Sequence, residues 1–135
     1  EANIVDRVID FLKACRTFYV ATVDGDQPRV RPFGAAARYK NRIYIATNNQ
    51  KDVFKQMLAN PNVEICGIAP DGRWIRISGR AVADPDLAAK RRMLEENAPL
   101  KSMYSLDDGI FEVLYIDQAR AVIYSFTAEP EVISL

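Results

Sequence analysis

Histidine is absent from this sequence of 135 residues, and cysteine occurs only twice. Without an imidazole, the chain cannot build a Ser-His-Asp or Cys-His nucleophilic system, and histidine cannot hold zinc or haem. Cys15 and Cys66 form no CxxC pair. We therefore expect no metal site, and we interpret both thiols as reduced, buried, small apolar side chains of a cytoplasmic protein.

Long apolar runs and an excess of charge are missing as well. No run approaches the ~18 apolar residues that a membrane-spanning helix needs, and no secretory leader is recognisable. The 18 basic and 18 acidic residues cancel, which argues against a dedicated nucleic-acid binder. The sequence therefore predicts a single soluble domain over residues 1–135, with neither a nucleic acid nor a membrane as partner.

Hydrophobic periodicity predicts three helices among several short strands. The helices are expected over residues 4–15, 49–58 and 85–97, with Asn3, Asn49 and Asp84 as their caps. The strands are expected over residues 17–23, 28–39, 43–47, 63–69, 73–83, 111–116 and 121–126. The first three strands form a meander, a tight Asp117-Gln118 turn joins the last two, and the tail after residue 127 is unassigned. This pattern lacks a βαβ rhythm and favours a small antiparallel barrel with peripheral helices.

Positive charge is concentrated in residues 29–55. This segment has seven basic residues and one acid, a balance of +6, whereas the rest of the chain has 11 basic and 17 acidic residues, a balance of −6. The basic residues are Arg29, Arg31, Arg38, Lys40, Arg42, Lys51 and Lys55. Two interpretations remain open, a solvated face or a binding site for a small anion such as phosphate.

Two motifs within this segment suit an anion. Arg29 and Arg31 share one face of their predicted strand and can clamp a phosphate or carboxylate, and the small residues 34–37 let a flat ligand approach the backbone. The alternative is an edge strand protected by charges and Pro32. The TNNQK stretch, residues 47–51, joins a strand to a helix and combines a hydroxyl, a lysine and helix-start amides, although it also reads as a simple capped helix.

The stretch RWIRISGRAVA, residues 73–83, alternates between two faces. Ile75 and Ile77 suit a core, whereas Trp74 and Arg76 point to the opposite face. A tryptophan there indicates an interface or an aromatic platform for a planar ligand. The alternative is that a helix of its own chain covers Trp74.

Three segments in this order resemble the pyridoxamine 5′-phosphate oxidase-like family of FMN-binding split barrels. They are FYVATVDGDQPRVRPFG, RIYIATNNQKDVFKQMLANPNVEI and RWIRISGRAVA. The resemblance implies a mainly β fold, a six-stranded antiparallel Greek-key split barrel with three to four helices. It also implies a homodimer with FMN in clefts between the two subunits.

By the same resemblance, the flavin ring lies along the strand from Arg29 to Gly34. Either Arg29 or Arg31 would hold the phosphate and ribityl chain together with Thr47 and Lys51, and Trp74 falls where the family places a residue of the partner subunit. The cofactor-binding residues implied are Arg29, Val30, Arg31, Pro32, Phe33, Thr47, Asn48, Lys51, Trp74 and Arg76.

The function implied is that of an FMN-dependent oxidoreductase whose substrate the sequence does not identify. Oxidation of pyridoxamine phosphate itself is not expected, because the chain lacks the basic, histidine-containing C-terminal motif of that oxidase. The alternatives are a flavin-binding electron carrier without turnover, or a split barrel that binds haem or a deazaflavin. Tyr44, Tyr104, Tyr115 and solvent remain open as proton donors.

Overall fold

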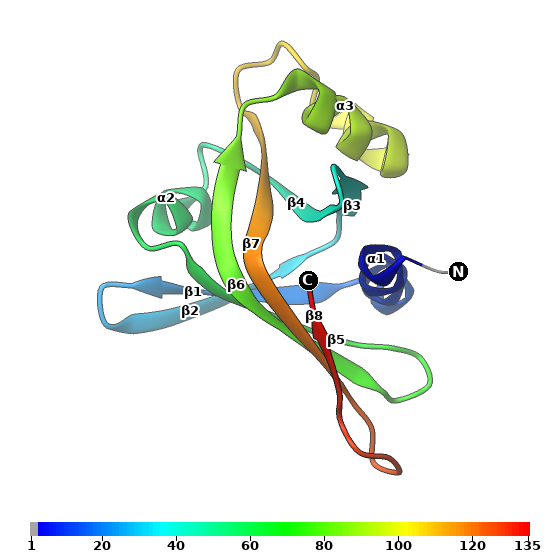
Figure 1. The fold of residues 1–135 in the computed structure, drawn as a ribbon. Coiled ribbons are helices and arrows are strands. Elements are labelled where there is room, and N and C mark those ends of the chain that lie inside the picture. The colour runs from blue at the N-terminus through cyan, green and yellow to red at the C-terminus, as the bar shows by residue number, and fades with distance from the viewer. Residues whose placement is uncertain (1–2) are drawn as a thin grey trace.

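The computed structural model describes residues 3–135, which form three α helices, one 3₁₀ helix and eight strands (Figure 1). The helices are α1 (Ile4–Cys15), α2 (Asp52–Ala59), α3 (Leu87–Glu96) and the 3₁₀ helix η1 (Ala98–Ser102). The strands are β1 (Phe18–Asp24), β2 (Gln27–Phe33), β3 (Ala36–Tyr39), β4 (Arg42–Asn48), β5 (Asn62–Ile68), β6 (Trp74–Asp84), β7 (Phe111–Tyr124) and β8 (Glu131–Ser134).

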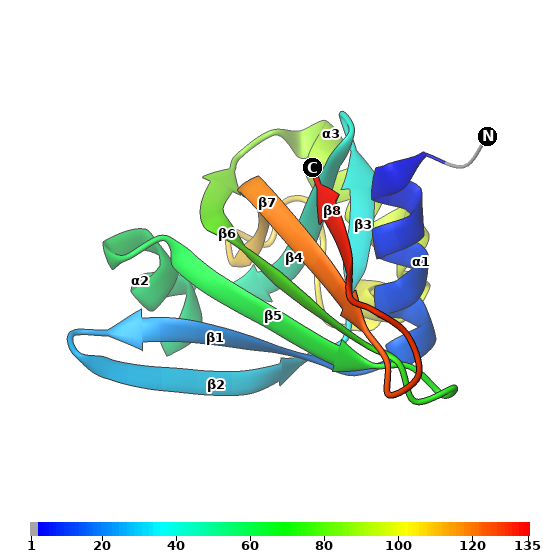
Figure 2. The ribbon, with the colours of Figure 1, turned by 60° about the horizontal axis from the view of Figure 1, so that its bottom comes forward.

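One antiparallel sheet holds all the strands, in the order β2-β1-β5-β6-β7-β4-β3, with β8 added to β7. Strands β2 and β3 stand at opposite ends of this order, although only Gly34 and Ala35 separate them in the chain. The sheet must therefore curl until its two ends meet, and it stays open there because β2 and β3 are not paired (Figure 2). This split barrel with peripheral helices confirms the predicted fold class, although the sheet has eight strands rather than the six expected.

Two groups of buried side chains fill the molecule. The barrel core lies inside the curled sheet and includes the fully buried Leu12, Ile65 and Ile77. A smaller group, the α3 core, lies between α3 and the strands β3, β4 and β7. It consists of Ala35, Ala37, Tyr44, Ala89, Met93, Leu94, Phe111 and Val113. Both groups pack against the same sheet, but only the α3 core lies beneath α3.

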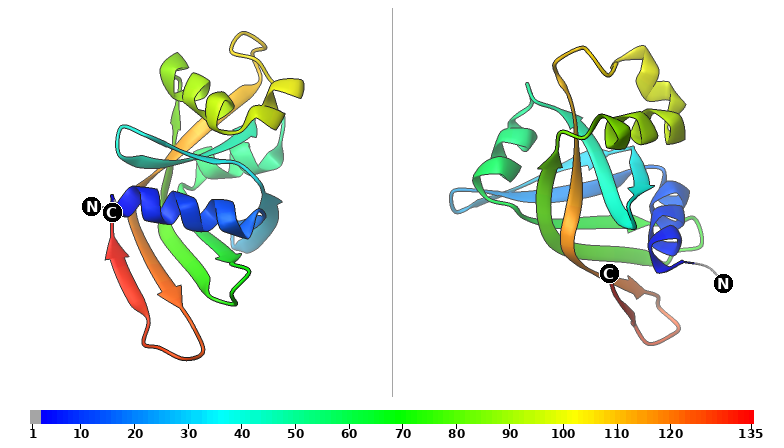
Figure 3. Two further views of the ribbon diagram at one scale, coloured as in Figure 1. Left: turned by 90° about the vertical axis from the view of Figure 1, so that its right-hand side faces the viewer. Right: turned by 45° about the horizontal axis from the view of Figure 1, so that its top comes forward.

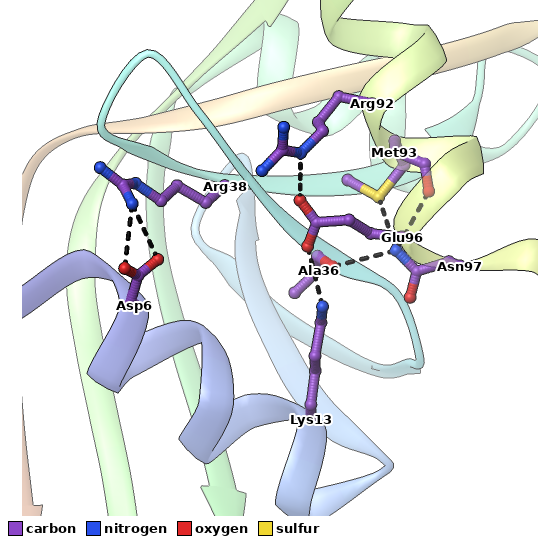
Figure 4. A network of polar contacts seen from close by, with 8 residues as sticks. All are labelled: Asp6, Lys13, Ala36, Arg38, Arg92, Met93, Glu96 and Asn97. Carbon is purple, nitrogen blue, oxygen red and sulfur yellow. Dashed lines mark hydrogen bonds and ion pairs between the residues drawn. The ribbon is translucent and has the colours of Figure 1, made fainter. Parts of the chain in front are cut away.

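The helices cover different parts of the sheet (Figure 3). Helix α1 contacts β3, β4 and β5, α2 contacts β1 and β6, and α3 contacts β3, β4 and β7. Three ion pairs connect α1 to its neighbours. Arg38 on β3 lies 2.9 Å from Asp6 and Lys13 lies 2.8 Å from Glu96 of α3 (Figure 4), and Arg7 lies 2.9 Å from Glu131 of β8. Of these pairs, the one between Lys13 and Glu96 ties α3 to α1.

Two strand predictions were wrong. The strand predicted over residues 28–39 is two strands, because β2 pairs with β1 and β3 pairs with β4, so the predicted meander is absent. The strands predicted over 111–116 and 121–126 are one continuous strand, β7. Gln118 does take a left-handed φ of 53° there, but the register shift between Ser78 and Arg80 on β6 accommodates it, so the pairing resumes beyond it.

Two predicted helix caps were also wrong. Asp86, not Asp84, caps α3 by accepting a hydrogen bond from the Ala88 amide, while Asp84 ends β6. No side chain caps α2, because Asn49 instead donates to the carbonyl of Gly109 and to Glu112.

The predictions for the tail and the cysteines need correction too. The tail after residue 127 is not without structure, since β8 pairs there with β7. Cys66 is exposed on the outer face of β5 rather than buried, and Cys15 is half-buried; both thiols are free. No helix of residues 3–135 is long and apolar enough to cross a membrane.

Candidate functional site

A cavity of about 330 Å³ lies where β2 passes into β3. Strand β4, the start of α2 and η1 form its remaining walls. The lining residues are Arg31, Pro32, Phe33, Gly34, Ala35, Ala46, Thr47, Lys51, Val53, Asn97, Pro99, Leu100, Met103 and Tyr104. A cavity of this size is within the ~300–1,000 Å³ range of small-molecule sites.

Arg31 supplies one of the two cationic groups at this cavity. Its guanidinium donates to the Val20 carbonyl at 3.0 Å, to Thr22 Oγ1 at 2.8 Å and to Gln56 Oε1 at 2.7 Å. Burial, and secondarily the charge of Arg29, lower the pKa of Arg31, yet an arginine stays cationic at any physiological pH. These three hydrogen bonds fix the orientation of the guanidinium and leave its other N–H groups free to bind an anion.

Lys51 and Thr47 lie in the turn between β4 and α2. Thr47 is the last buried residue of β4, because alternation along the strand turns its side chain inward. Lys51 stands at the N-cap position of α2, where no side chain satisfies the first amides of the helix. Unsatisfied amides and the helix dipole favour an anion at this point. The charged groups of the cavity therefore come from β2 and from this turn.

The rest of the cavity wall is mostly apolar. Phe33 and Val53 are buried, and the small side chains of Ala35 and Ala46 leave space that larger residues would fill. Segment 97–104, which we call the roof, contributes Asn97, Pro99, Leu100, Met103 and Tyr104. Mostly apolar walls that include two cationic side chains suit a ligand with a flat apolar part and an anionic part.

Sequence reasoning missed the roof as part of the site, apart from naming Tyr104 among the candidate proton donors. Segment 98–110 has no apolar periodicity and contains no fully buried residue, so it gives no pattern to recognise. A side chain does anchor it: Asn97 Nδ2 donates to the Ala36 carbonyl at 3.0 Å and also contacts Met93 (Figure 4). Only the folded chain brings this segment beside β2 and β4.

The structure brings five of the ten predicted cofactor residues together at the cavity: Arg31, Pro32, Phe33, Thr47 and Lys51. Asn48 flanks it, donating from Nδ2 to the Tyr104 hydroxyl at 2.8 Å. The sequence left open which arginine faces the site, and only Arg31 lines the cavity. Arg29 is exposed and paired with Asp24 at 3.3 Å.

The remaining predicted residues do not line the cavity of their own chain. Val30 is 67% exposed, and Arg76 pairs with Glu64 at 2.9 Å. Trp74 stacks on Tyr124 with ring centroids 5.4 Å apart, so a strand neighbour contacts it rather than a helix. Of these, Val30 and Arg76 belong to the exposed surface of the sheet.

Two of the candidate proton donors are placed away from the cavity. The Tyr44 hydroxyl is buried and donates to Asp84 at 2.7 Å, and the ring of Tyr115 packs under the guanidinium of Arg42, 4.1 Å from its centroid. Tyr104 lines the cavity. Residues 3–135 contain no cluster of His, Cys, Asp or Glu suited to a metal ion.

The sequence profile of pyridoxamine 5′-phosphate oxidase matches residues 4–122. The chain belongs to this family. Among solved structures, a NimC/NimA family protein from Clostridium acetobutylicum is 50% identical and superposes with a TM-score of 0.94, over 97% of this chain and 92% of that one. A comparison with curated proteins found no match.

More distant members of the fold carry different descriptions. A heme binding protein from Mycobacterium smegmatis is 13% identical, with a TM-score of 0.75 over 99% of this chain and 59% of that one. A structure described as F420 reductase is 19% identical, with a TM-score of 0.62 over 79% of this chain and 89% of that one. At these identities the likeness establishes the shared fold.

Proposed function

We propose that this pyridoxamine 5′-phosphate oxidase family member binds FMN in the cavity and acts as an oxidoreductase on a small organic substrate. The observation that supports this most is that Arg31, Thr47 and Lys51 line one cavity whose remaining walls are mostly apolar. A phosphorylated, flat cofactor has the two properties that these walls match.

The donors present fit an FMN phosphate. Arg31 has free N–H groups, Lys51 is a mobile point charge, Thr47 adds a hydroxyl, and the start of α2 is uncapped. Pro32 and Phe33 would flank the flavin ring beside the small residues Gly34 and Ala35. Bound FMN supplies the electron transfer, in steps of one or two electrons, while these side chains bind and orient it and exclude water.

We also propose that two copies of the chain form a homodimer with the cofactor at their interface. The outer surface exposes Val30, Ile68 at 61% and Phe126 at 90%, the last beside the stacked Trp74 and Tyr124 rings. A second copy related by a two-fold axis would cover such apolar surface. The partner's cavity would then be lined by four predicted residues that lie outside the cavity of their own chain: Trp74, Arg76, Arg29 and Val30.

The alternative cofactors differ in what they require. A deazaflavin with an anionic side chain could use the same cationic groups, Arg31 and Lys51. Haem would need an axial ligand from Met, Tyr or Cys, because histidine is absent. Met103 and Tyr104 line the cavity and would be the nearest candidates. The absorption spectrum of the purified protein distinguishes the three cofactors, and NAD(P)H oxidation distinguishes turnover from simple electron carriage.

The decisive experiment compares FMN with riboflavin, which lacks the phosphate. Lys51→Ala should weaken FMN binding by about tenfold to a hundredfold, the value of a hydrogen bond to a charged group, and should leave riboflavin unchanged. Lys55→Ala is the matched control, since Lys55 is an exposed lysine of α2 outside the cavity. No binding of FMN by flavin-free protein, measured by titration and by the shift in Tm, would refute the proposal.

The dimer is tested separately by Trp74→Glu. A charge placed at the proposed contact should produce monomers in light scattering and lower the flavin absorbance in the same peak. A variant that stays dimeric with full flavin would show that this face is not the interface.

A further inference from the structure

Among the contacts of residues 97–104, the Tyr104 hydroxyl makes the roof's one hydrogen bond to the turn that carries Thr47 and Lys51. Its oxygen accepts a hydrogen bond from Asn48 Nδ2 at 2.8 Å. The orientation of that amide is fixed, because Asn48 Oδ1 accepts from the Gln50 amide at 3.0 Å. Asn48 therefore presents its donor, not its acceptor, to Tyr104.

This orientation determines where the phenolic proton can go. A hydroxyl has one proton to donate, and no residue within 3–135 accepts it from Tyr104. The ring is held as well, stacked on the buried Phe111 with centroids 5.0 Å apart. Tyr104 lines the cavity together with Lys51 and Thr47. The free O–H is thus a positioned donor on a residue of the cavity wall.

We propose that Tyr104 donates a hydrogen bond to the cofactor's phosphate, which makes the roof part of the anion site. This inference rests on the proposed FMN function. Besides Tyr104, the roof is held by the Asn97 side chain at one end, by packing of Leu100 on the α3 core, and, beyond its other end, by the hydrogen bonds of Asn49 to Gly109 and Ile110. A phosphate bound by both Tyr104 and Lys51 would therefore hold the roof over the bound cofactor. Riboflavin would not do so, because it lacks the phosphate.

Tyr104→Phe removes the hydroxyl and keeps the ring that stacks on Phe111. We expect FMN affinity to fall by about tenfold, within the range for a hydrogen bond to a charged group, and riboflavin affinity to stay unchanged. Tyr115→Phe is the matched control, because it makes the same chemical change outside the cavity. Equal losses for FMN and riboflavin, or no loss for either, would overturn the inference.

Hydrogen exchange gives a second readout that does not depend on activity. In the unmodified protein, FMN should slow exchange in residues 98–110 more than riboflavin does, and Tyr104→Phe should abolish this difference. Equal protection by the two flavins would contradict the proposal.

Asn48→Asp tests the positioning of the hydroxyl. It keeps an oxygen for the Gln50 amide but places a carboxylate beside Tyr104, so the hydroxyl should donate there instead. We expect the Tyr104→Phe substitution to have no further effect on FMN affinity in that background. If FMN binds and responds to Lys51→Ala but not to Tyr104→Phe, the proposed function stands and this inference fails; if FMN does not bind at all, both fail.

Discussion

The barrel core consists of apolar side chains, whereas the α3 core includes a tyrosine hydroxyl, and both border the cavity, the first through Phe33 and Val53 and the second through Ala35. Ile65 and Ile77 have no exposed surface and need only neighbours of the right shape. Tyr44 must also satisfy its hydroxyl, which it does by donating to Asp84. The barrel core mainly stabilises the sheet, whereas the α3 core also supports the roof, because Leu100 and Tyr104 pack against it.

The largest expected effect comes from emptying either core. Ile65→Ala and Met93→Ala should each lower the free energy of unfolding by about 2–5 kcal/mol, measured by urea denaturation. Only Met93→Ala should also weaken binding of the proposed cofactor, because Met93 contacts Asn97 and through it supports the roof. A loss of FMN affinity as large for Ile65→Ala would show that the two cores do not act separately.

A smaller effect should follow from overfilling the barrel core at Gly79. An added Cβ would lie 2.8 Å from the Asp117 carbonyl and would clash with Ile116, because β6 passes close to β7 at the register shift. We expect Gly79→Ala to cost about 1–3 kcal/mol of unfolding free energy in the same assay. Ser78→Ala, one residue away, is the control and should change little.

The stability that Tyr44 contributes to the α3 core should depend on pH. Burial, reinforced by the hydrogen bond to Asp84 and by its charge, raises the pKa of Tyr44 well above the usual value near 10. The folded state thus keeps a proton that the unfolded state releases, so the stability from this group is present below pH ~10 and lost above it. The wild type should lose up to about 1.4 kcal/mol per pH unit more than Tyr44→Phe in alkaline urea titrations. Parallel curves would contradict this.

The smallest effect is expected at the link between the cores. Burial alone would raise the pKa of Glu96, but hydrogen bonds from Arg92 and Lys13 outweigh it and lower the pKa. Lys13→Ala should cost no more than about 1 kcal/mol near neutral pH, since the lysine is largely exposed. The cost should shrink in acid, once the pH has fallen through the lowered pKa of Glu96 and the carboxylate is protonated, and thermal melts at neutral and strongly acidic pH would detect this. A cost that persists in acid would point to lost packing instead.

The sequence was sufficient for the parts of the fold that have a local signal. Alternation predicted β1, β4, β5 and β6 within a residue or two, and helical periodicity with Asn3 as cap predicted α1. The sequence was not sufficient where the structure of a segment depends on which strands it pairs with. Nothing local says that β2 and β3 pair with different neighbours, or that a left-handed Gln118 continues a strand.

The candidate site divides in the same way. The charges of Arg31 and Lys51 are visible in the sequence as a basic segment, but only the folded chain shows that Arg31 lines the cavity while Arg29 pairs with Asp24 across the hairpin. The roof gave no signal, since its residues contact the cavity only through tertiary folding. The exposure of Cys66 likewise follows from which face of β5 points outward.

The position of β7 in the sheet has a consequence for the order in which the molecule is made. Strands β2, β1, β5 and β6 form one paired set and β3 and β4 another, and β7 is the strand that pairs with both. A chain emerging from the ribosome therefore carries Arg31 and Thr47 on two unconnected pieces of sheet until residues 111–124 have been synthesised. The cavity is one of the last features to form, and pairing across such long sequence separations makes folding slow.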